Sequence, residues 1–175
     1  MPVREIRKYP DAVLKQKSGR VEIFDEGLRN LIQDMLDTMY AASGVGLAAN
    51  QVGIPLRVAV MDTTARKEEK EGRRPPIVII NPEIISTEGS VVEEEGCLSV
   101  PECFEKVNRA AKVKVRAQDI TGMFFEIEGE GLLAKALQHE IDHLNGILFI
   151  DRLSPLKRDF LRRRLRKAAA AGVQK

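Results

Sequence analysis

The chain contains two histidines, and they stand four residues apart in the run HEIDH at 139–143. Apolar residues around this run recur at three- and four-residue spacing, which predicts a helix over 132–144 that stops at Asn145-Gly146. Residues four apart lie on one face of a helix, so both imidazoles can bind one metal ion, with Glu140 beside them. The fold must therefore supply an apolar helix that carries a metal site on one face.

The metal site needs a third ligand. Catalytic sites of this kind generally use three protein ligands and keep a position open for water or substrate. No histidine follows His143, whereas Cys97, upstream in the segment EGCLS at 95–99, offers a thiolate next to a glycine that lets the backbone approach closely. Histidines that serve only as packing are the alternative, but burying two titratable groups in an apolar helix brings no structural benefit.

Composition limits the class of protein. With 175 residues, 43% of them hydrophobic and 31% charged, the sequence predicts one globular domain over 1–175, which would also carry the metal site. No run approaches the ~18 apolar residues of a membrane helix, and the N-terminus lacks the apolar core of a signal peptide, so we expect a cytoplasmic protein. In such a reducing compartment we expect Cys97 and Cys103 to be free of a disulfide.

The remaining secondary structure indicates the α+β class. Asp25 is suited to cap a helix that runs to about Ala42, and a second helix is expected at the C-terminus. Strands and a hairpin lie between these helices without β-α-β alternation, which predicts antiparallel or mixed sheets around a central HEIDH helix. The expected strands are 56–62, 77–80, 113–117 and 124–128, with an exposed charged loop at 65–76.

The C-terminal segment 154–175 differs in charge from the rest of the chain. It holds eight basic residues and one acidic residue, whereas the rest holds 20 basic and 25 acidic residues. Ser154-Pro155 indicates the start of a helix with an apolar stripe that can pack on the body and a cationic outer face. The cations either meet a polyanion or are simply solvated. The stripe consists of Leu156, Phe160, Leu161 and Leu165.

Three segments of the chain resemble the signature motifs of the peptide deformylases. They are GVGLAANQ at 44–51, EGCLS at 95–99 and QHEIDH at 138–143, and they occur in the family's order and at similar separations. The likeness extends from Tyr9-Pro10-Asp11 through the C-terminal helix. One departure is Glu102, which stands where many relatives carry glycine. The resemblance therefore does not imply the conformation of the substrate-side loop that follows the EGCLS motif.

The resemblance implies a reaction. By it, Cys97, His139 and His143 bind a metal ion with a water as fourth ligand, and Glu140 carries the proton. The family removes the formyl group from the N-terminal formyl-methionine of new polypeptides and releases formate. It favours iron(II), although the same ligands also suit zinc, nickel or cobalt.

The resemblance also assigns residues to the substrate. The side-chain amide of Gln51 and the backbone N–H of Leu98 stabilise the oxyanion, whereas the sequence around Gln51 alone would indicate an ordinary turn residue. The peptide backbone is expected to contact residues of the first two motifs. The methionine side chain is expected to contact Leu132 and Ala136, which precede the third motif and which core packing explains equally well. The residues expected to contact the peptide are Val45, Gly46, Gly96, Leu132 and Ala136.

Two other functions remain open from the residues alone. A zinc endopeptidase shares the HEIDH chemistry but is disfavoured by the Cys97 motif. A binding module with a purely structural metal and an RNA-binding basic helix would close the fourth coordination position. We expect nascent formylated chains as substrates, contact with the ribosome through the basic helix, and no membrane or DNA partner.

Asp142 is a candidate to pair with Arg109 and so to support a metal ligand.

Overall fold

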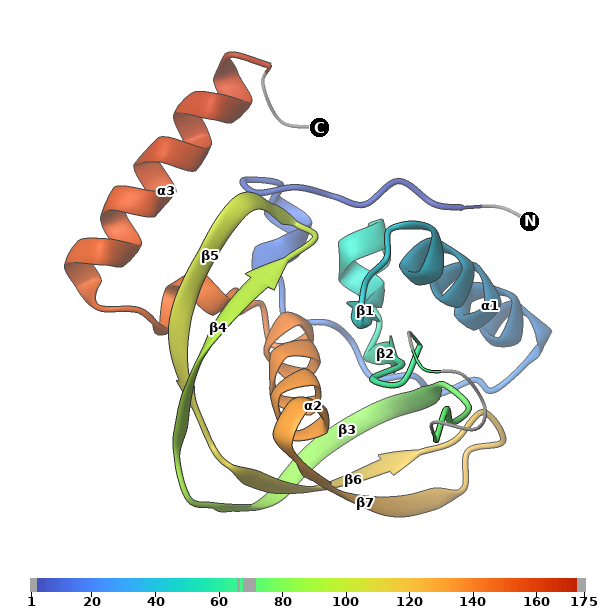
Figure 1. Ribbon diagram of the computed structural model, residues 1–175. Helices are drawn as coiled ribbons and strands as arrows, with labels where there is room; N and C mark the ends of the chain where they lie inside the picture. Colours follow the sequence, from blue (N-terminus) through green and yellow to red (C-terminus); the bar gives the residue numbers. More distant parts are fainter. Residues whose placement is uncertain (1–2, 66, 68–71, 173–175) are drawn as a thin grey trace.

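In a computed structural model, residues 3–65, 67 and 72–172 are described (Figure 1). Within these residues the order is one helix, seven strands and two further helices, with short 3-10 turns between some of them, so the predicted α+β class is confirmed. The helices are α1 (Glu26–Ala41), α2 (Gly131–Leu144) and α3 (Pro155–Ala170). The strands are β1 (Gly46–Ala48), β2 (Val58–Met61), β3 (Ile77–Glu88), β4 (Val91–Cys97), β5 (Val100–Arg109), β6 (Lys112–Gln118) and β7 (Phe124–Glu130).

The strands form two sheets in which every pairing between described strands is antiparallel. One sheet has the order β1-β2-β3-β6-β7, and the other consists of β4 and β5. Figure 1 shows α2 in the middle, with the β4-β5 hairpin on one side, β1 and β2 on the other, and β6 and β7 beneath it. The helix that carries both histidines is therefore surrounded by strands.

The predicted start of α1 at Asp25 and the predicted end of α2 at Asn145-Gly146 are confirmed. The carboxylate of Asp25 accepts a hydrogen bond of 3.0 Å from the backbone N–H of Leu28 and so caps α1. Asn145 caps the C-terminus of α2, and Gly146 follows with φ +76°. A Cβ at Gly146 would also lie 2.5 Å from the carbonyl oxygen of Lys15, so only glycine fits this stop.

The core explains why α1 and α2 form. Leucine, isoleucine and methionine side chains of α1 pack against β1 and β2, while the apolar face of α2 packs against β6 and β7. Each such side chain contributes about 1.5–3 kcal/mol when fully buried. The fully or nearly fully buried members on the two helices are Leu28, Leu31, Ile32, Met35, Met39, Ala134, Ala136, Leu137, Ile141 and Leu144.

The strand predictions were partly right. In the predicted hairpin, Val113, Val115 and Ala117 are buried and pair with residues of β7, which confirms its single buried face. The strand expected at 77–80 continues to Glu88, and the β4-β5 hairpin was not predicted at all. Charged runs in these segments hid the alternation by which a strand is recognised.

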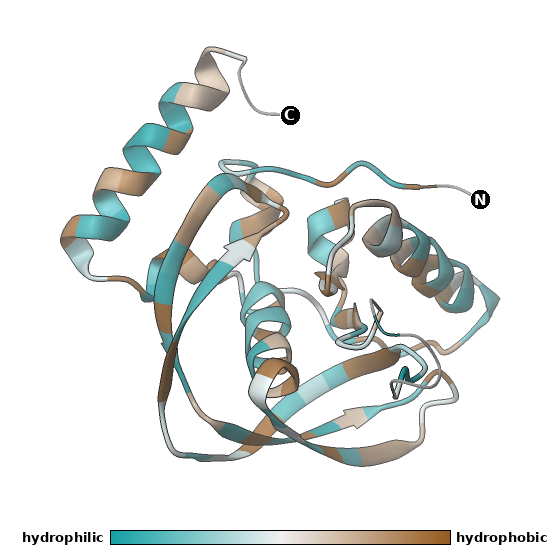
Figure 2. Ribbon diagram, viewed as in Figure 1, coloured by the Kyte–Doolittle hydropathy of each residue, from teal (hydrophilic) through white to brown (hydrophobic). Residues whose placement is uncertain are grey.

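Helix α3 corrects one prediction. Leu161 and Leu165 are buried against the body, but Leu156 is 85% exposed and Phe160 is 55% exposed, so these two do not pack. Figures 1 and 2 show α3 as a largely hydrophilic rod that extends from the body beyond the β4-β5 hairpin. The buried apolar contact of α3 with the body is confined to the narrow line through 161 and 165. Charged side chains add contacts beside this line: Lys157 with Glu105, Arg162 with Asp151 and Arg166 over the ring of Tyr9. None of the helices in the described residues combines the length and apolar character of a membrane span.

Candidate metal centre

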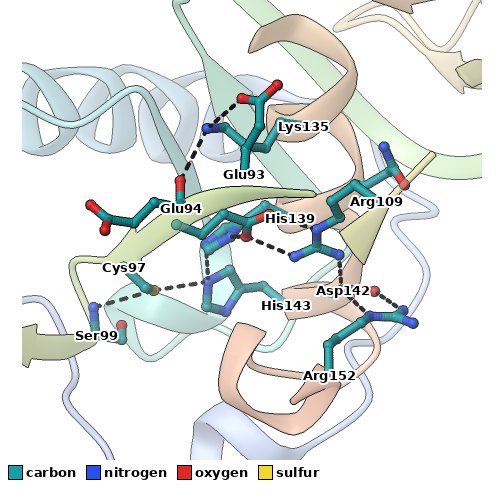
Figure 3. A network of polar contacts seen from close by, with 12 residues as sticks. Glu93, Glu94, Cys97, Ser99, Arg109, Lys135, His139, Asp142, His143 and Arg152 are labelled. Carbon is teal, nitrogen blue, oxygen red and sulfur yellow. Dashed lines mark hydrogen bonds and ion pairs between the residues drawn. The ribbon is translucent and has the colours of Figure 1, made fainter. Parts of the chain in front are cut away.

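Three candidate ligands from two distant segments meet at one point (Figure 3). Cys97 Sγ at the end of β4 lies 3.3 Å from His143 Nε2, and the Nε2 atoms of His139 and His143 on α2 are 3.2 Å apart. All three donor atoms lie within 4.8 Å of one another. A tetrahedral ion with bonds of about 2.0–2.3 Å places its donors about 3.3–3.6 Å apart, so the spacing fits a metal such as zinc.

The tautomer of His139 is set by Glu95. His139 Nδ1 lies 3.0 Å from Glu95 Oε1, which places the proton on Nδ1 and leaves Nε2 as a donor for a metal. Burial is the largest influence on Glu95 and raises its pKa, but hydrogen bonds from Arg109 and His139 outweigh burial and lower the pKa to about 2. Glu95 is therefore held as a carboxylate. Its supporting role was not predicted, although it stands in the EGCLS motif.

Arg109 links Glu95 to Asp142. Its guanidinium donates to both Glu95 oxygens at 2.8 and 2.9 Å and to Asp142 Oδ2 at 2.6 Å. The predicted pair of Asp142 and Arg109 is thus confirmed. All three side chains are buried, which makes these charge-assisted contacts stronger than the same pairs at the surface.

Glu140 lies against Gly46 at the wall of a cavity. A Cβ at Gly46 would come within 2.5 Å of Glu140 Oε2, so the glycine leaves the room that this carboxyl group occupies. Glu140 Oε1 is buried and has no hydrogen-bond partner among the described residues, which is rare for a structural carboxylate. Burial, the largest influence, raises the pKa of Glu140 to about 7.

Gln51 points its amide at the same place. Its Nε2 donates to Ser99 Oγ at 3.0 Å and lies 3.7 Å from Cys97 Sγ, while its Oε1 accepts from the backbone N–H of Ala48 at 2.9 Å. The amide is therefore oriented by two contacts, with its N–H side toward the candidate ligands.

A cavity of about 370 Å³ joins these groups. His143 is buried behind its wall, and every other residue that the sequence assigned to the site lines it. Four lining residues outside the motifs were not predicted: Ser43, Glu94, Phe104 and Lys135. They carry no motif; the ring of Phe104 lies over Gly96, where a Cβ would come within 2.5 Å of it. The predicted lining residues are Val45, Gly46, Gln51, Gly96, Cys97, Leu98, Leu132, Ala136, His139 and Glu140.

A family model described as polypeptide deformylase matches residues 3–159. Two similar relatives carry the name peptide deformylase. The one from Acidobacterium capsulatum is 54% identical over 172 residues, which cover 98% of this chain and 99% of the relative. The one from Syntrophobacter fumaroxidans is 53% identical over 167 residues, which cover 95% of this chain and 96% of the relative.

Solved structures agree with the sequence comparisons. The crystal structure of a peptide deformylase from Legionella pneumophila superimposes with a TM-score of 0.88 at 52% identity and covers 99% of both chains. The peptide deformylase from Ehrlichia chaffeensis in complex with actinonin superimposes with a TM-score of 0.87 at 42% identity, covering 95% of this chain and 98% of the other.

Proposed function

The chain belongs to the polypeptide deformylase family, and from this premise we propose which of its residues carry out the reaction. The protein is a metal-dependent hydrolase that removes the formyl group from the N-terminal formyl-methionine of new polypeptides and releases formate. The observation that carries the proposal is the meeting of all three sequence motifs at one cavity, around three donor atoms within 4.8 Å of one another.

The residues fit a divalent metal ion. Cys97, His139 and His143 would hold it through one sulfur and two nitrogens, and Glu95 keeps the His139 donor atom turned inward. When bound, such an ion supplies Lewis-acid polarisation and lowers the pKa of water toward neutrality. We propose iron(II) as the native ion; zinc, nickel and cobalt match the same mixture of soft and borderline donors.

Glu140 carries the proton. It accepts a proton as water attacks the formyl carbon and returns it to the departing amine nitrogen, because a carboxyl group whose pKa lies near neutrality can do both. Its position at the cavity wall beside His139, with one oxygen unpaired among the described residues, supports this role. General acid-base catalysis of this kind contributes about 10²- to 10⁴-fold.

The oxyanion is stabilised by the side-chain amide of Gln51 and the backbone N–H of Leu98. Both residues line the cavity, and Gln51 Nε2 lies 3.7 Å from Cys97 Sγ. Because Ala48 and Ser99 already orient this amide, its dipole needs little reorganisation during the reaction.

The peptide binds between two strands. Val45 just before β1, Gly46 at its start and Gly96 near the end of β4 line the cavity, and we propose that they pair with the main chain of the peptide. Leu132 and Ala136 on α2 then contact the methionine side chain. Main-chain pairing does not read side chains, so varied residues after methionine are tolerated.

We also propose that α3 holds the enzyme near the ribosome, in the cytoplasm where formylated chains emerge. Its outward cations support binding to RNA phosphates, with release of counterions. Charge-neutral variants of Arg163 and Arg164, both exposed, should weaken binding to purified ribosomes and flatten its salt dependence. Binding that keeps its strength and its salt dependence would remove this proposal.

One assay tests the reaction. Protein prepared and loaded with iron(II) without oxygen is incubated with a formyl-Met peptide and with the matching acetyl-Met peptide, and the released amine is measured. The formyl peptide should be hydrolysed and the acetyl peptide spared. Cleavage inside the peptide would indicate an endopeptidase, and no hydrolysis with metal bound would indicate a structural site. Loss of activity on exposure to air would support iron(II), because thiolates and ferrous iron are oxidised readily.

A further inference from the structure

A surface arginine that carries no motif, Arg152, contacts the network behind the metal centre (Figure 3). Arg152 ends the short 3-10 turn Phe149–Arg152 just before α3, and its side chain is 44% exposed. Its Nε and Nη2 donate to the two oxygens of Asp142 at 2.8 and 2.6 Å. This two-pronged geometry is the strongest form of an arginine-carboxylate contact.

From Asp142 the contacts lead inward without a gap. The Oδ2 atom that accepts from Arg152 also accepts from Arg109, which holds both oxygens of Glu95, and Glu95 Oε1 in turn lies 3.0 Å from His139 Nδ1. The side chains of Asp142, Arg109 and Glu95 are only 8%, 4% and 3% exposed. The chain thus joins solvent to a metal-ligand candidate through three buried charges.

The charges in this series of contacts from Arg152 to Glu95 balance only when Arg152 is present. Two guanidinium groups face two carboxylates, and the buried Arg109 is shared between Glu95 and Asp142. Without Arg152, Arg109 would be the last guanidinium left to balance the charges of Glu95 and Asp142, among the residues described. Arg109 would then be drawn toward Asp142, because an uncompensated buried carboxylate is costly. Its two-pronged hold on Glu95 would loosen.

We propose that Arg152 is a positioning residue that fixes the orientation of His139 through Asp142, Arg109 and Glu95, and thereby increases the affinity of the site for its metal ion. This inference rests on the ligand role proposed above for His139. Residues that contact a ligand directly typically change metal affinity by about 10- to 100-fold. Arg152 acts through three intermediates, so a loss of about threefold to tenfold is expected on removing it.

Removing Arg152 also has a smaller effect of opposite sign on metal affinity. Loss of its positive charge favours a nearby cation, but solvent screens the charge of a side chain that is 44% exposed. Loss of orientation should therefore exceed the gain in attraction, and the sign of the change in affinity separates the two.

The experiment compares three variants of the full-length protein with the unsubstituted protein. Arg152→Met removes the contact, Arg152→Lys restores the charge without the two-pronged geometry, and Arg162→Met is a matched control. Arg162 also pairs with an aspartate of the same 3-10 turn, Asp151, but that aspartate does not contact the network. Zinc affinity is measured by competition with a chelator, and the absorption spectrum of the cobalt-substituted protein reports ligand geometry.

Arg152→Met should bind zinc about threefold to tenfold more weakly and shift the cobalt spectrum, Arg152→Lys should recover part of both, and Arg162→Met should change neither. Unchanged affinity in Arg152→Met, tighter binding, or an equal loss in Arg162→Met would overturn the inference. Failure of the unsubstituted protein to bind zinc or cobalt would instead overturn the proposed metal site, so the two failures are distinguishable.

Discussion

The metal centre and the terminal helix hold their charges in different ways. Around the metal centre, Arg109 and Glu95 are buried, contact each other through two hydrogen bonds and have partners on several elements. On α3, most cations are exposed, and two leucines provide the buried contact with the body. A single geometry is therefore fixed at the first region, while the second leaves a charged face open to a partner. Substitutions in the two regions should separate chemistry from stability.

The largest effect is expected from Glu140→Gln. The amide keeps the shape of the side chain but cannot carry the proton, so kcat should fall by about 10²- to 10⁴-fold while the free energy of unfolding changes little. Steady-state kinetics and metal analysis of the same preparation check this. An unaltered rate with metal retained would remove Glu140 as the proton carrier.

The opposite result is expected from α3. Leu161 is 3% exposed and Leu156 is 85% exposed, so Leu161→Ala should lower the free energy of unfolding by about 2–5 kcal/mol and Leu156→Ala by less than about 0.5 kcal/mol. Urea unfolding measures both, and kcat should stay the same in each folded variant. If Leu156→Ala proved as destabilising as Leu161→Ala, α3 would pack differently from the structure described.

Asp151 joins α3 to the body through contacts with Arg162 and Lys15, and its carboxylate predicts a pH dependence of stability. Burial is the largest influence and raises its pKa, but contacts with Lys15, the Leu148 N–H and Arg162 outweigh burial and lower it. The folded state thus binds this proton less readily than the unfolded state. The stabilisation is present above the ordinary pKa of about 3.9 and is lost as the pH falls through the lower, folded value.

Asp151→Asn should therefore destabilise the protein by about 1–2 kcal/mol at pH 7, and the difference should shrink as the pH falls below about 4. Urea unfolding at a series of pH values measures this. A difference that stays constant down to pH 2 would show that the charge of Asp151 contributes nothing to stability.

The smallest effect concerns Glu102 near the start of β5, two residues before the cavity-lining Phe104. Glu102 on β5 has φ +55°, a left-handed conformation that favours glycine. Glu102→Gly should stabilise the protein by up to about 1 kcal/mol. The control is Lys106→Gly, at a position of the same strand without a positive φ, which should destabilise. Destabilisation by both variants would refute strain at Glu102.

Periodicity predicted the parts of the fold whose side chains alternate between core and solvent. Helices α1 and α2 and the β6-β7 hairpin have such a pattern. The hairpin that carries Cys97 does not, because β4 runs Val-Val-Glu-Glu-Glu and faces a cavity rather than a regular core. The apolar stripe of α3 was predicted too wide, because spacing along a helix does not reveal how much of its surface the body reaches.

Much of the candidate site could be predicted from the sequence because its chemistry depends on fixed spacings between residues. The HEIDH run places two imidazoles on one face, and the resemblance connected it with Cys97. The supporting contacts have no such spacing: Arg152 reaches Asp142 only because a 3-10 turn brings the chain back after α2. Phe104 and Lys135 line the cavity through strand and helix packing that no local pattern encodes.

The proposed reaction depends on one sulfur and two imidazole nitrogens that bind a single ion. X-ray absorption spectroscopy on the full-length protein loaded with one equivalent of zinc measures this directly. We expect one sulfur at about 2.3 Å and nitrogens at about 2.0–2.1 Å, with the sulfur lost in Cys97→Ala. A coordination shell without sulfur in the unsubstituted protein, or one unchanged in Cys97→Ala, would contradict it.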